Sequence, residues 1–195
     1  MQHGAEKDGT RSTEHLPYKF DPYEWSARVV VDKDTLGVPF TVYILITPPS
    51  LTSDPLAGKD PLDWIKSKYY SGEVAAMTGF GGRSYGSTNA DVSAEIIEGY
   101  VSLNEKLKEF IGTLEPEAVE EHLRGHLLWK VGKSGRGENK EVDLSKLPTL
   151  EVTVFSAKLK RVRDDIPIPI YEDAVEHPDI TKGKQGGTKS QETFS

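Results

Sequence analysis

The chain has 195 residues, a net charge of −7 and no cysteine. This length suits one domain with a substantial core. The lack of cysteine excludes disulfides, thiolate metal sites and thiol nucleophiles. The acidic balance argues against a nucleic-acid partner, because phosphate contacts need a surplus of Lys and Arg on one face.

Apolar residues are too dispersed along the chain for a membrane span. Mean hydropathy is −0.50, and no window approaches eighteen consecutive apolar residues, so we expect no membrane partner. Residues 1–15 are polar from the start and lack the apolar core of a signal peptide. The cytoplasm is therefore the default expectation for the location of the protein, unless a leader has been lost.

The predicted domain opens with aromatic side chains, which follow a disordered leader expected over residues 1–16. These aromatic residues are Tyr18, Phe20, Tyr23 and Trp25. A β-branched run then predicts a strand over Ala27–Asp32. Turn residues separate it from a second, more apolar strand over Phe40–Ile46. We expect these two strands to form a hairpin.

Proline-rich and glycine-rich stretches flank the third predicted strand. Prolines prevent regular structure over residues 47–60, after which Pro61–Lys66 is predicted to form a helical turn with Trp64 facing inward. The third strand is expected over Ser71–Met77. It leads into residues 79–86, a glycine-rich segment that carries Phe80 and Tyr85.

The clearest pattern covers residues 94–131 and reads as strand, helix, helix, strand. Apolar residues recur at helical spacing in the first half, and a period of two follows residue 126. Residues that start or stop helices delimit both predicted helices: a capping box of Ser102 and Glu105, then Gly112, Pro116 and Gly125. The two helices can bury their apolar stripes only against the sheet to which the flanking strands belong.

The remaining segments complete the fold prediction. A clean alternation predicts a strand over Leu150–Ala157, whereas prolines keep residues 165–170 out of a sheet interior. Residues 172–195 contain so few apolar side chains that we expect a disordered tail. The sequence therefore predicts one mainly β domain over residues 17–171. Its expected architecture is an antiparallel β-sandwich or barrel-like domain with two or three short helices inserted between strands.

Two short motifs share letters with catalytic signatures but lack their context. Gly132-Lys133-Ser134 matches the end of a phosphate-binding loop, yet the glycine required five residues earlier is Leu127. Gly82-Arg83-Ser84-Tyr85-Gly86 fits a serine hydrolase elbow, but no helix follows as that motif requires. We interpret the first as a hairpin loop and keep Ser84 as a minor enzymatic alternative.

His122 and His126 lie four residues apart, the spacing at which two imidazoles on one helix can share a metal ion. The helix end expected at Gly125 falls between them. The other histidines lie in the leader and the tail: His3, His15 and His177. Because a third ligand is hard to find, we predict no metal site, no bound cofactor and no catalytic residue in this chain.

Taken in order, seven segments resemble the carboxy-terminal domain of fungal tyrosinases. None is diagnostic alone, and together they cover about residues 18–160. The segments are Tyr23–Val31, Phe40–Tyr43, Gly72–Val74 with the glycine-rich segment after it, Glu98–Asn104, Leu114–Glu117, Leu128–Val131 and Leu147–Val154.

The resemblance implies a β-rich domain that follows a type-3 copper catalytic domain. In that family the domain lies over the entrance to the dicopper centre, keeps the enzyme latent and is removed on activation. The family's catalytic domain binds its coppers through six histidines, whereas this chain has five in all. The resemblance thus implies a non-catalytic cap, with copper held by a partner catalytic domain in cis or in trans.

The resemblance also implies site residues. The family cap inserts an aromatic side chain toward the coppers, and Phe80, or else Tyr85, is the candidate for this plug because nearby glycines let it project. The candidate interface residues are the aromatic side chains at the start of the domain: Tyr18, Phe20, Tyr23 and Trp25. Some family members carry a Cys-x-x-Cys near the plug for copper loading, a role that this cysteine-free chain puts in doubt. The alternative function is a free-standing binding module without an oxidase partner.

Overall fold

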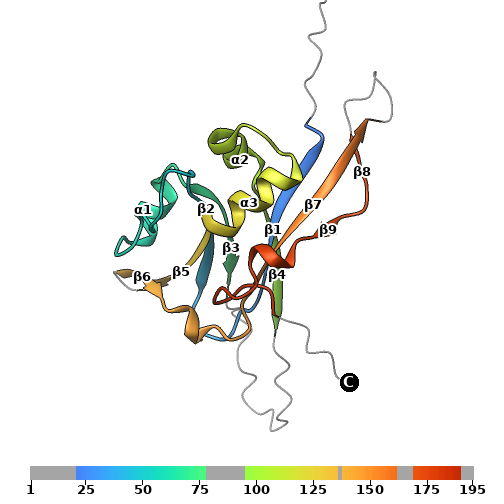
Figure 1. Cartoon of the computed structure of the whole chain (residues 1–195). Coiled ribbons are helices and arrows are strands. Elements are labelled where there is room, and N and C mark those ends of the chain that lie inside the picture. The colour runs from blue at the N-terminus through green and yellow to red at the C-terminus, as the bar shows by residue number, and fades with distance from the viewer. Residues whose placement is uncertain (1–20, 78–94, 136–137, 162–168, 190–195) are drawn as a thin grey trace, which may run out of the picture.

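The computed structural model describes residues 21–77, 95–135, 138–161 and 169–189. Within these ranges the chain forms two antiparallel β-sheets and three short α-helices (Figure 1). The predicted fold class, mainly β and sandwich-like with short helices between strands, is confirmed. The expected leader over residues 1–16 lies outside the described ranges.

The first sheet has the strand order β4-β1-β7-β8, with β9 also paired to β7, and the second has the order β3-β2-β5-β6. The strands are β1 (Tyr23–Asp32), β2 (Phe40–Ile46), β3 (Tyr70–Ala76), β4 (Ile96–Ser102), β5 (Leu127–Gly135), β6 (Glu138–Val142), β7 (Glu151–Arg161), β8 (Pro169–Tyr171) and β9 (Val175–Glu176). The helices are α1 (Pro61–Lys66), α2 (Asn104–Ile111) and α3 (Pro116–His126), and the 3₁₀ turns are η1 (Leu144–Lys146) and η2 (Pro178–Ile180).

The main core lies between the two sheets. β1 buries every second side chain from Trp25 to Val31. From the second sheet, β2 directs Val42 and Ile44 into the same cluster, and β5 adds Trp129. Side chains at every second position of these strands thus share the face that is turned toward the main core.

β2 is buried on both faces, which explains its continuous apolar run. Tyr43 and Leu45 point away from the main core and form a second cluster with Leu56 and Trp64. Trp64 lies on α1 and is fully buried, as the sequence predicts. α1 thus covers the outer face of the second sheet, and β2 is central in the packing as well as in the strand order.

The predicted hairpin between the first two strands is wrong. β1 pairs with β4 and β7, whereas β2 pairs with β3 and β5. The turn at residues 33–39 therefore carries the chain from one sheet to the other. Each strand already has a hydrogen-bonded neighbour on both sides, so neither has an edge free for the other.

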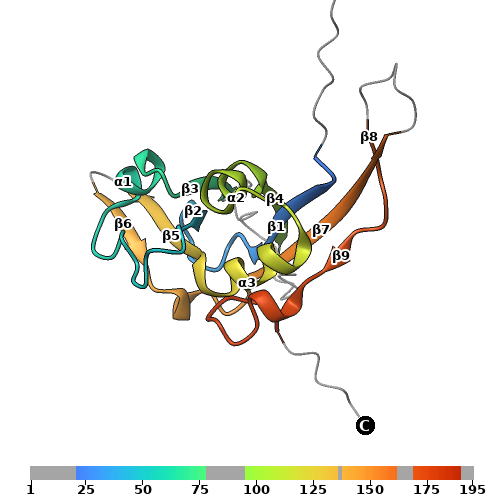
Figure 2. The same ribbon diagram turned by 45° about the horizontal axis from the view of Figure 1, so that its top comes forward.

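α2 and α3 lie between the two sheets, where α2 contacts β1 and α3 contacts β5 (Figure 2). Leu107 from α2, with Val119 and Leu123 from α3, are fully buried in the main core. The strand, helix, helix, strand order predicted for residues 94–131 is confirmed, although α3 continues through Gly125. No helix in the described ranges is long and apolar enough to cross a membrane.

The two sheets meet along β3 and β4, where glycine permits close approach. A Cβ atom on Gly99 would lie 2.7 Å from the Val74 side chain, and one on Gly72 would lie 2.6 Å from Val101. Separations this short are steric clashes, so both positions require a residue without a side chain. The glycines thereby close one side of the sandwich.

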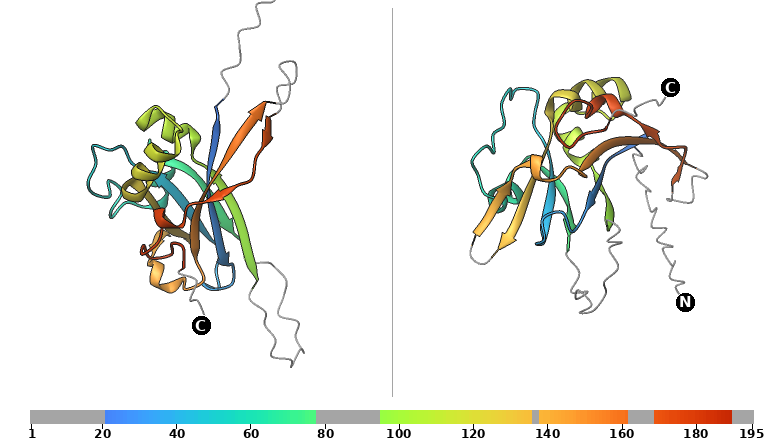
Figure 3. Two further views of the ribbon diagram at one scale, coloured as in Figure 1. Left: turned by 45° about the vertical axis from the view of Figure 1, so that its right-hand side comes forward. Right: turned by 90° about the horizontal axis from the view of Figure 1, so that it is seen from below.

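Residues 172–189, which we call the strap, follow the free edge of β7 (Figure 3). The expectation of a disordered tail is wrong for this segment. The amide of His177 and the carbonyl of Gly186 both hydrogen-bond to β7 at 2.8 Å, and Ile180 is only 1% exposed. Low apolar content misled the prediction, because backbone pairing to an open sheet edge needs few apolar side chains. Residues 190–195 lie outside the described ranges.

Candidate functional site

The strand registers bring two connections together at one end of the molecule. β1 ends at Asp32, opposite Ile96 at the start of β4. β2 begins at Phe40, opposite Ala76 at the end of β3. The turn between β1 and β2 therefore lies beside the point where the chain leaves β3 and returns to β4. We call this region the β3–β4 end.

The plug candidates Phe80 and Tyr85 belong to the connection between β3 and β4, and both lie outside the described residues. The structure fixes the two ends of that connection. On the β4 side, the carbonyl of Glu95 accepts a hydrogen bond from the amide of Lys33 at 3.1 Å, and their side chains form an ion pair. The β1–β2 turn thus anchors the returning segment, while the plug assignment stays a prediction.

Exposed apolar side chains lie at the two ends of this connection and in the β1–β2 turn. Met77 is 70% exposed, Ile96 is 52% exposed and Val38 is 41% exposed. Met77 follows β3 and Ile96 starts β4, so the registers bring these two positions to the same end of the molecule. Val38 lies in the β1–β2 turn and lines a separate hollow with Lys133 and Val142. Exposed apolar side chains that gather in one place often mark a contact surface. Sequence reasoning missed this group, because no local pattern shows that these residues are neighbours.

The interface candidates fall into three classes. Tyr18 and Phe20 lie outside the described residues, and Tyr23 is half-buried and packs against the core. Trp25 is fully buried, and its Nε1 donates a hydrogen bond to the carbonyl of Leu114 at 2.9 Å. The assignment of Trp25 to an interface is therefore wrong, because its indole belongs to the domain's own core. Tyr23 starts β1 and lies about 30 Å from the β3–β4 end.

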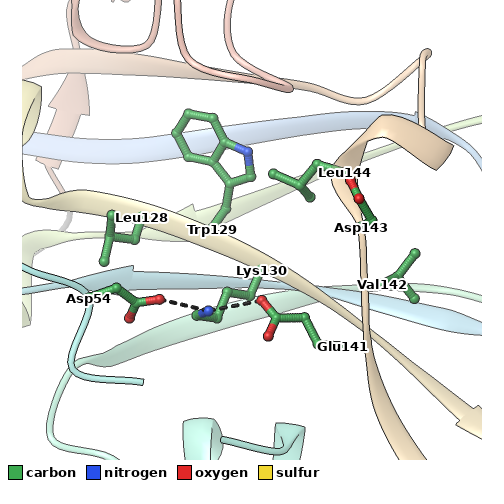
Figure 4. A pocket seen from close by; sticks show the side chains of 8 residues that line it. All are labelled: Asp54, Leu128, Trp129, Lys130, Glu141, Val142, Asp143 and Leu144. Carbon is green, nitrogen blue, oxygen red and sulfur yellow. Dashed lines mark hydrogen bonds and ion pairs between the residues drawn. The ribbon is translucent and has the colours of Figure 1, made fainter. Parts of the chain in front are cut away.

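An open hollow of about 420 Å³ lies beside β5 and β6 and contains a buried cation (Figure 4). The Lys130 side chain is 8% exposed, and its Nζ lies 2.8 Å from Asp54 and 2.9 Å from Glu141. Burial disfavours the charge, but hydrogen bonds with Asp54 and then Glu141 outweigh burial and raise the pKa of Lys130. Two carboxylates neutralise the ammonium group. We therefore interpret the cluster as a structural contact that joins β5, β6 and the loop between β2 and α1, which carries Asp54.

His122 and His126 share one face of α3, and their rings stack with centroids 4.6 Å apart and planes 15° apart. Imidazole lone pairs lie in the ring plane, so nearly parallel rings direct them side by side rather than toward one ion. The Nδ1 of His126 lies 3.1 Å from the Thr47 hydroxyl. Burial, and then the neighbouring His126, lowers the pKa of His122 to about 4. We interpret the pair as part of the core packing.

No group of three or more His, Cys, Asp or Glu side chains is placed to bind a metal within the ranges that the structure describes. Gly132, Lys133 and Ser134 belong to β5, so they form a strand rather than a phosphate-binding loop. The possible hydrolase serine, Ser84, falls outside the described residues.

Ser156, His177 and Glu120 have the distances of a serine hydrolase triad. Ser156 Oγ lies 2.8 Å from His177 Nε2, and His177 Nδ1 lies 3.1 Å from Glu120 Oε1. Ser156 is only 5% exposed, however, and lies in β7 between β1 and β9. A nucleophile must reach its substrate, so this burial argues for a structural cluster that ties the strap to β7 and α3. Sequence reasoning missed the cluster because it placed His177 in a disordered tail.

Comparison with known families decides what kind of domain this is. A family model described as the tyrosinase C-terminal domain matches residues 24–154, more than half of the chain. The chain belongs to this family. The match begins in β1 and ends in β7, so it covers the second sheet, β1 and β4 of the first sheet, the helices and the β3–β4 end.

Individual relatives agree with the family assignment. A tyrosinase from Neurospora crassa is 27% identical over 170 residues, which cover 84% of this chain and 23% of that protein. A solved structure of recombinant mushroom tyrosinase shares the fold with a TM-score of 0.51 at 16% identity, covering 81% of this chain and 25% of that one. The chain thus spans about a quarter of the length of the tyrosinases that it matches.

Proposed function

We propose that this domain is a non-catalytic cap, which covers the active-site entrance of a type-3 copper oxidase and keeps that enzyme latent. Membership in the tyrosinase C-terminal domain family carries the proposal. The likeness to about a quarter of a whole tyrosinase supports it, because most of that relative's length lies outside the match. The catalytic partner is a tyrosinase-like copper domain, in cis or in trans.

The β3–β4 end is the surface that we assign to the contact. Met77 and Ile96 are exposed at the two ends of the connection that carries Phe80 and Tyr85. Docking would remove these apolar side chains from water, and such burial contributes about 25 cal/mol per Å². A stable interface of this kind buries about 1,200–2,000 Å² in total.

The mechanism that we assign to the cap is steric. Copper bound in the catalytic domain supplies the oxidation chemistry, and this chain contributes an aromatic ring that occupies the space of a phenolic substrate. Phe80 is our first candidate for that ring and Tyr85 the second. An inert domain suits this role, because the cap must exclude substrate without reacting with it.

An inhibition assay tests the cap function. The whole chain is added to a tyrosinase catalytic domain that lacks its own C-terminal domain, and diphenol oxidation is measured. We expect inhibition that Phe80→Ala weakens by about 2 kcal/mol or more, roughly thirtyfold, as for a central aromatic side chain of an interface. If Tyr85→Ala weakens inhibition instead, Tyr85 is the plug.

Tyr171→Ala is the matched control. Tyr171 is 56% exposed on β8, at the opposite end of the first sheet from Ile96, so its removal should leave inhibition unchanged. No inhibition at saturating amounts of the chain would contradict the cap and favour the free-standing binding module. Ester hydrolysis that Ser84→Ala abolishes would instead favour an enzyme.

A further inference from the structure

The strap lies beyond the part of the chain that the family model matches, which ends at residue 154. It pairs with β7 along its length: the amide of Glu172 donates to the carbonyl of Lys158, and the amide of Val152 donates to the carbonyl of Gly186, each at 2.8 Å. β7 has β1 on its other side. The strap therefore supplies the second neighbour of a strand that would otherwise present an open edge.

One side chain of the strap joins it to three other elements. The His177 ring lies 4.7 Å from the buried Trp25 ring of β1. Its Nε2 contacts Ser156 of β7, and its Nδ1 contacts Glu120 of α3. The His177 side chain is only 10% exposed. This position makes His177 one of the links between the strap and the body of the domain.

These contacts fit a neutral imidazole with its proton on Nδ1. That proton is donated to Glu120, and Nε2 then accepts the hydrogen of the Ser156 hydroxyl. A second proton, on Nε2, would make this nitrogen a hydrogen-bond donor. The Ser156 hydroxyl would then have to rotate so that its oxygen accepts and its hydrogen points away from the ring. The second proton would also place a positive charge where little water can reach it, which is unfavourable.

Glu120 is the charged group that faces the ring, and it only partly offsets this cost. Its carboxylate also accepts a hydrogen bond from Arg124 at 3.1 Å, so its charge is shared. Burial lowers the pKa of His177 and outweighs Glu120, which acts in the opposite direction. Two further groups that contact the ring, Trp25 on β1 and Ser156 on β7, are uncharged. The carboxylates nearest to His177 in the strap sequence, Glu176 and Asp179, are solvent-exposed.

We propose that the strap is a pH-released element: protonation of His177 detaches residues 172–189, including β9, from β7 and α3 while the other strands of both sheets stay folded. Release uncovers the edge of β7 and the Trp25 ring. The inference goes beyond the cap function and does not depend on it, because every contact involved lies within this chain.

Amide hydrogen exchange of the whole chain tests the proposal. Rates are measured from about pH 7.5 to about pH 5 and expressed as protection factors, which removes the intrinsic effect of pH on exchange. The amides of His177 and Val152 should lose protection as pH falls through the ordinary pKa of histidine, by up to about tenfold per pH unit for one proton. Amides of β2 and β5 should keep theirs.

Two variants assign the effect. His177→Gln should remove the pH dependence of strap protection, whereas His126→Gln, a change of the same kind on α3, should retain it. Glu120→Gln should extend the loss of protection to lower pH, because a neutral partner favours the imidazolium less.

Three results would overturn the proposal. Protection of the strap that rises as pH falls would mean that a charged His177–Glu120 ion pair holds it. Loss of protection in all strands together would mean global unfolding rather than release. An NMR titration of the His177 Cε1 proton in the unmodified chain needs no variant, and a midpoint above the ordinary histidine range would also exclude release by protonation.

Discussion

Asn104 illustrates how partners distant in the sequence decide what a side chain does. The spacing of Ser102 and Glu105 predicts a capping box, yet α2 begins at Asn104 without a side-chain cap. The side-chain amide of Asn104 instead forms two hydrogen bonds with the β1 backbone. Its Oδ1 accepts from Trp25 N at 2.8 Å, and its Nδ2 donates to Tyr23 O at 3.0 Å. Asn104 therefore joins the helical insertion to the first sheet.

Replacing Asn104 with Ala should lower the free energy of unfolding by about 2 kcal/mol, because two partly buried backbone groups lose their partner. Urea denaturation monitored by tryptophan fluorescence measures the change. Ser102→Ala is the control. A real capping box would make that change cost about 1 kcal/mol, whereas the observed helix start predicts a change within about 0.5 kcal/mol.

His122 should make the stability of the domain depend on pH. Burial lowers its pKa to about 4, below the unfolded value of about 6.5, so the folded state resists protonation. Its contribution is complete above about pH 6.5 and is lost as pH falls toward 4, up to about 3 kcal/mol. As pH decreases across this range, the denaturation midpoint of the unmodified chain should fall, and that of His122→Leu should fall less steeply. An unchanged slope in that variant, or a matching change in His126→Gln, would contradict the assignment.

At the scale of elements, the strap connects parts of the fold that the chain itself keeps apart. Lys184 Nζ donates toward the carbonyls of Leu127 at 3.2 Å and Leu123 at 3.4 Å, at the C-terminal end of α3. Trp129 of β5 donates its Nε1 hydrogen to the carbonyl of Gln185 at 3.0 Å. The strap thus contacts both sheets and the helix between them.

Lys184 should make the domain more stable at alkaline pH. Burial lowers its pKa to about 8 from an ordinary value of 10.5. The folded state therefore releases this proton before the unfolded state does, and stability rises as pH increases from about 8 toward 10.5. Urea denaturation at about pH 7.5 and pH 9.5 should show this rise. Lys184→Met should abolish it, while substitution of the exposed neighbour Lys182 by Met should not.

At the scale of the whole molecule, the two ends of the first sheet differ in character. The β3–β4 end gathers exposed apolar side chains around the plug connection, and the other end carries β8 and the start of β1. The strap follows β7 from Lys158 to Val152, so its last residues lie toward the β3–β4 end of the first sheet. Cap function and strap release are still tested independently, because amide exchange is measured on this chain without a catalytic domain.

Met77→Ser and Ile96→Ser should weaken inhibition of the catalytic domain without weakening the fold. Both side chains are more than half exposed, so each change should alter stability by no more than about 0.5 kcal/mol. Loss of apolar contact on docking should raise the inhibition constant several-fold in each case. Val175→Ser, at a residue 55% exposed on β9, is the control. Equal inhibition by all three variants would place the interface elsewhere.

The sequence by itself determined the family and most of the elements. A continuous apolar run located β2, alternation located β7, and the order of residues 94–131 followed from spacing and from glycine and proline positions. These signals are local, because the period of a strand or helix is written in neighbouring residues. The same seven segments that carried the resemblance lie within or beside the region that the family model matches.

Tertiary structure alone decided which strands pair, what the C-terminal segment does and where the exposed apolar side chains gather. β1 and β2 look like a hairpin locally, but other strands occupy both edges of each. The strap looks disordered by composition, yet β7 satisfies its backbone groups. One physical reason explains all of these differences. Hydrogen bonding to a sheet edge and the burial or exposure of a side chain depend on which residues are neighbours in space, and local sequence patterns do not specify those neighbours.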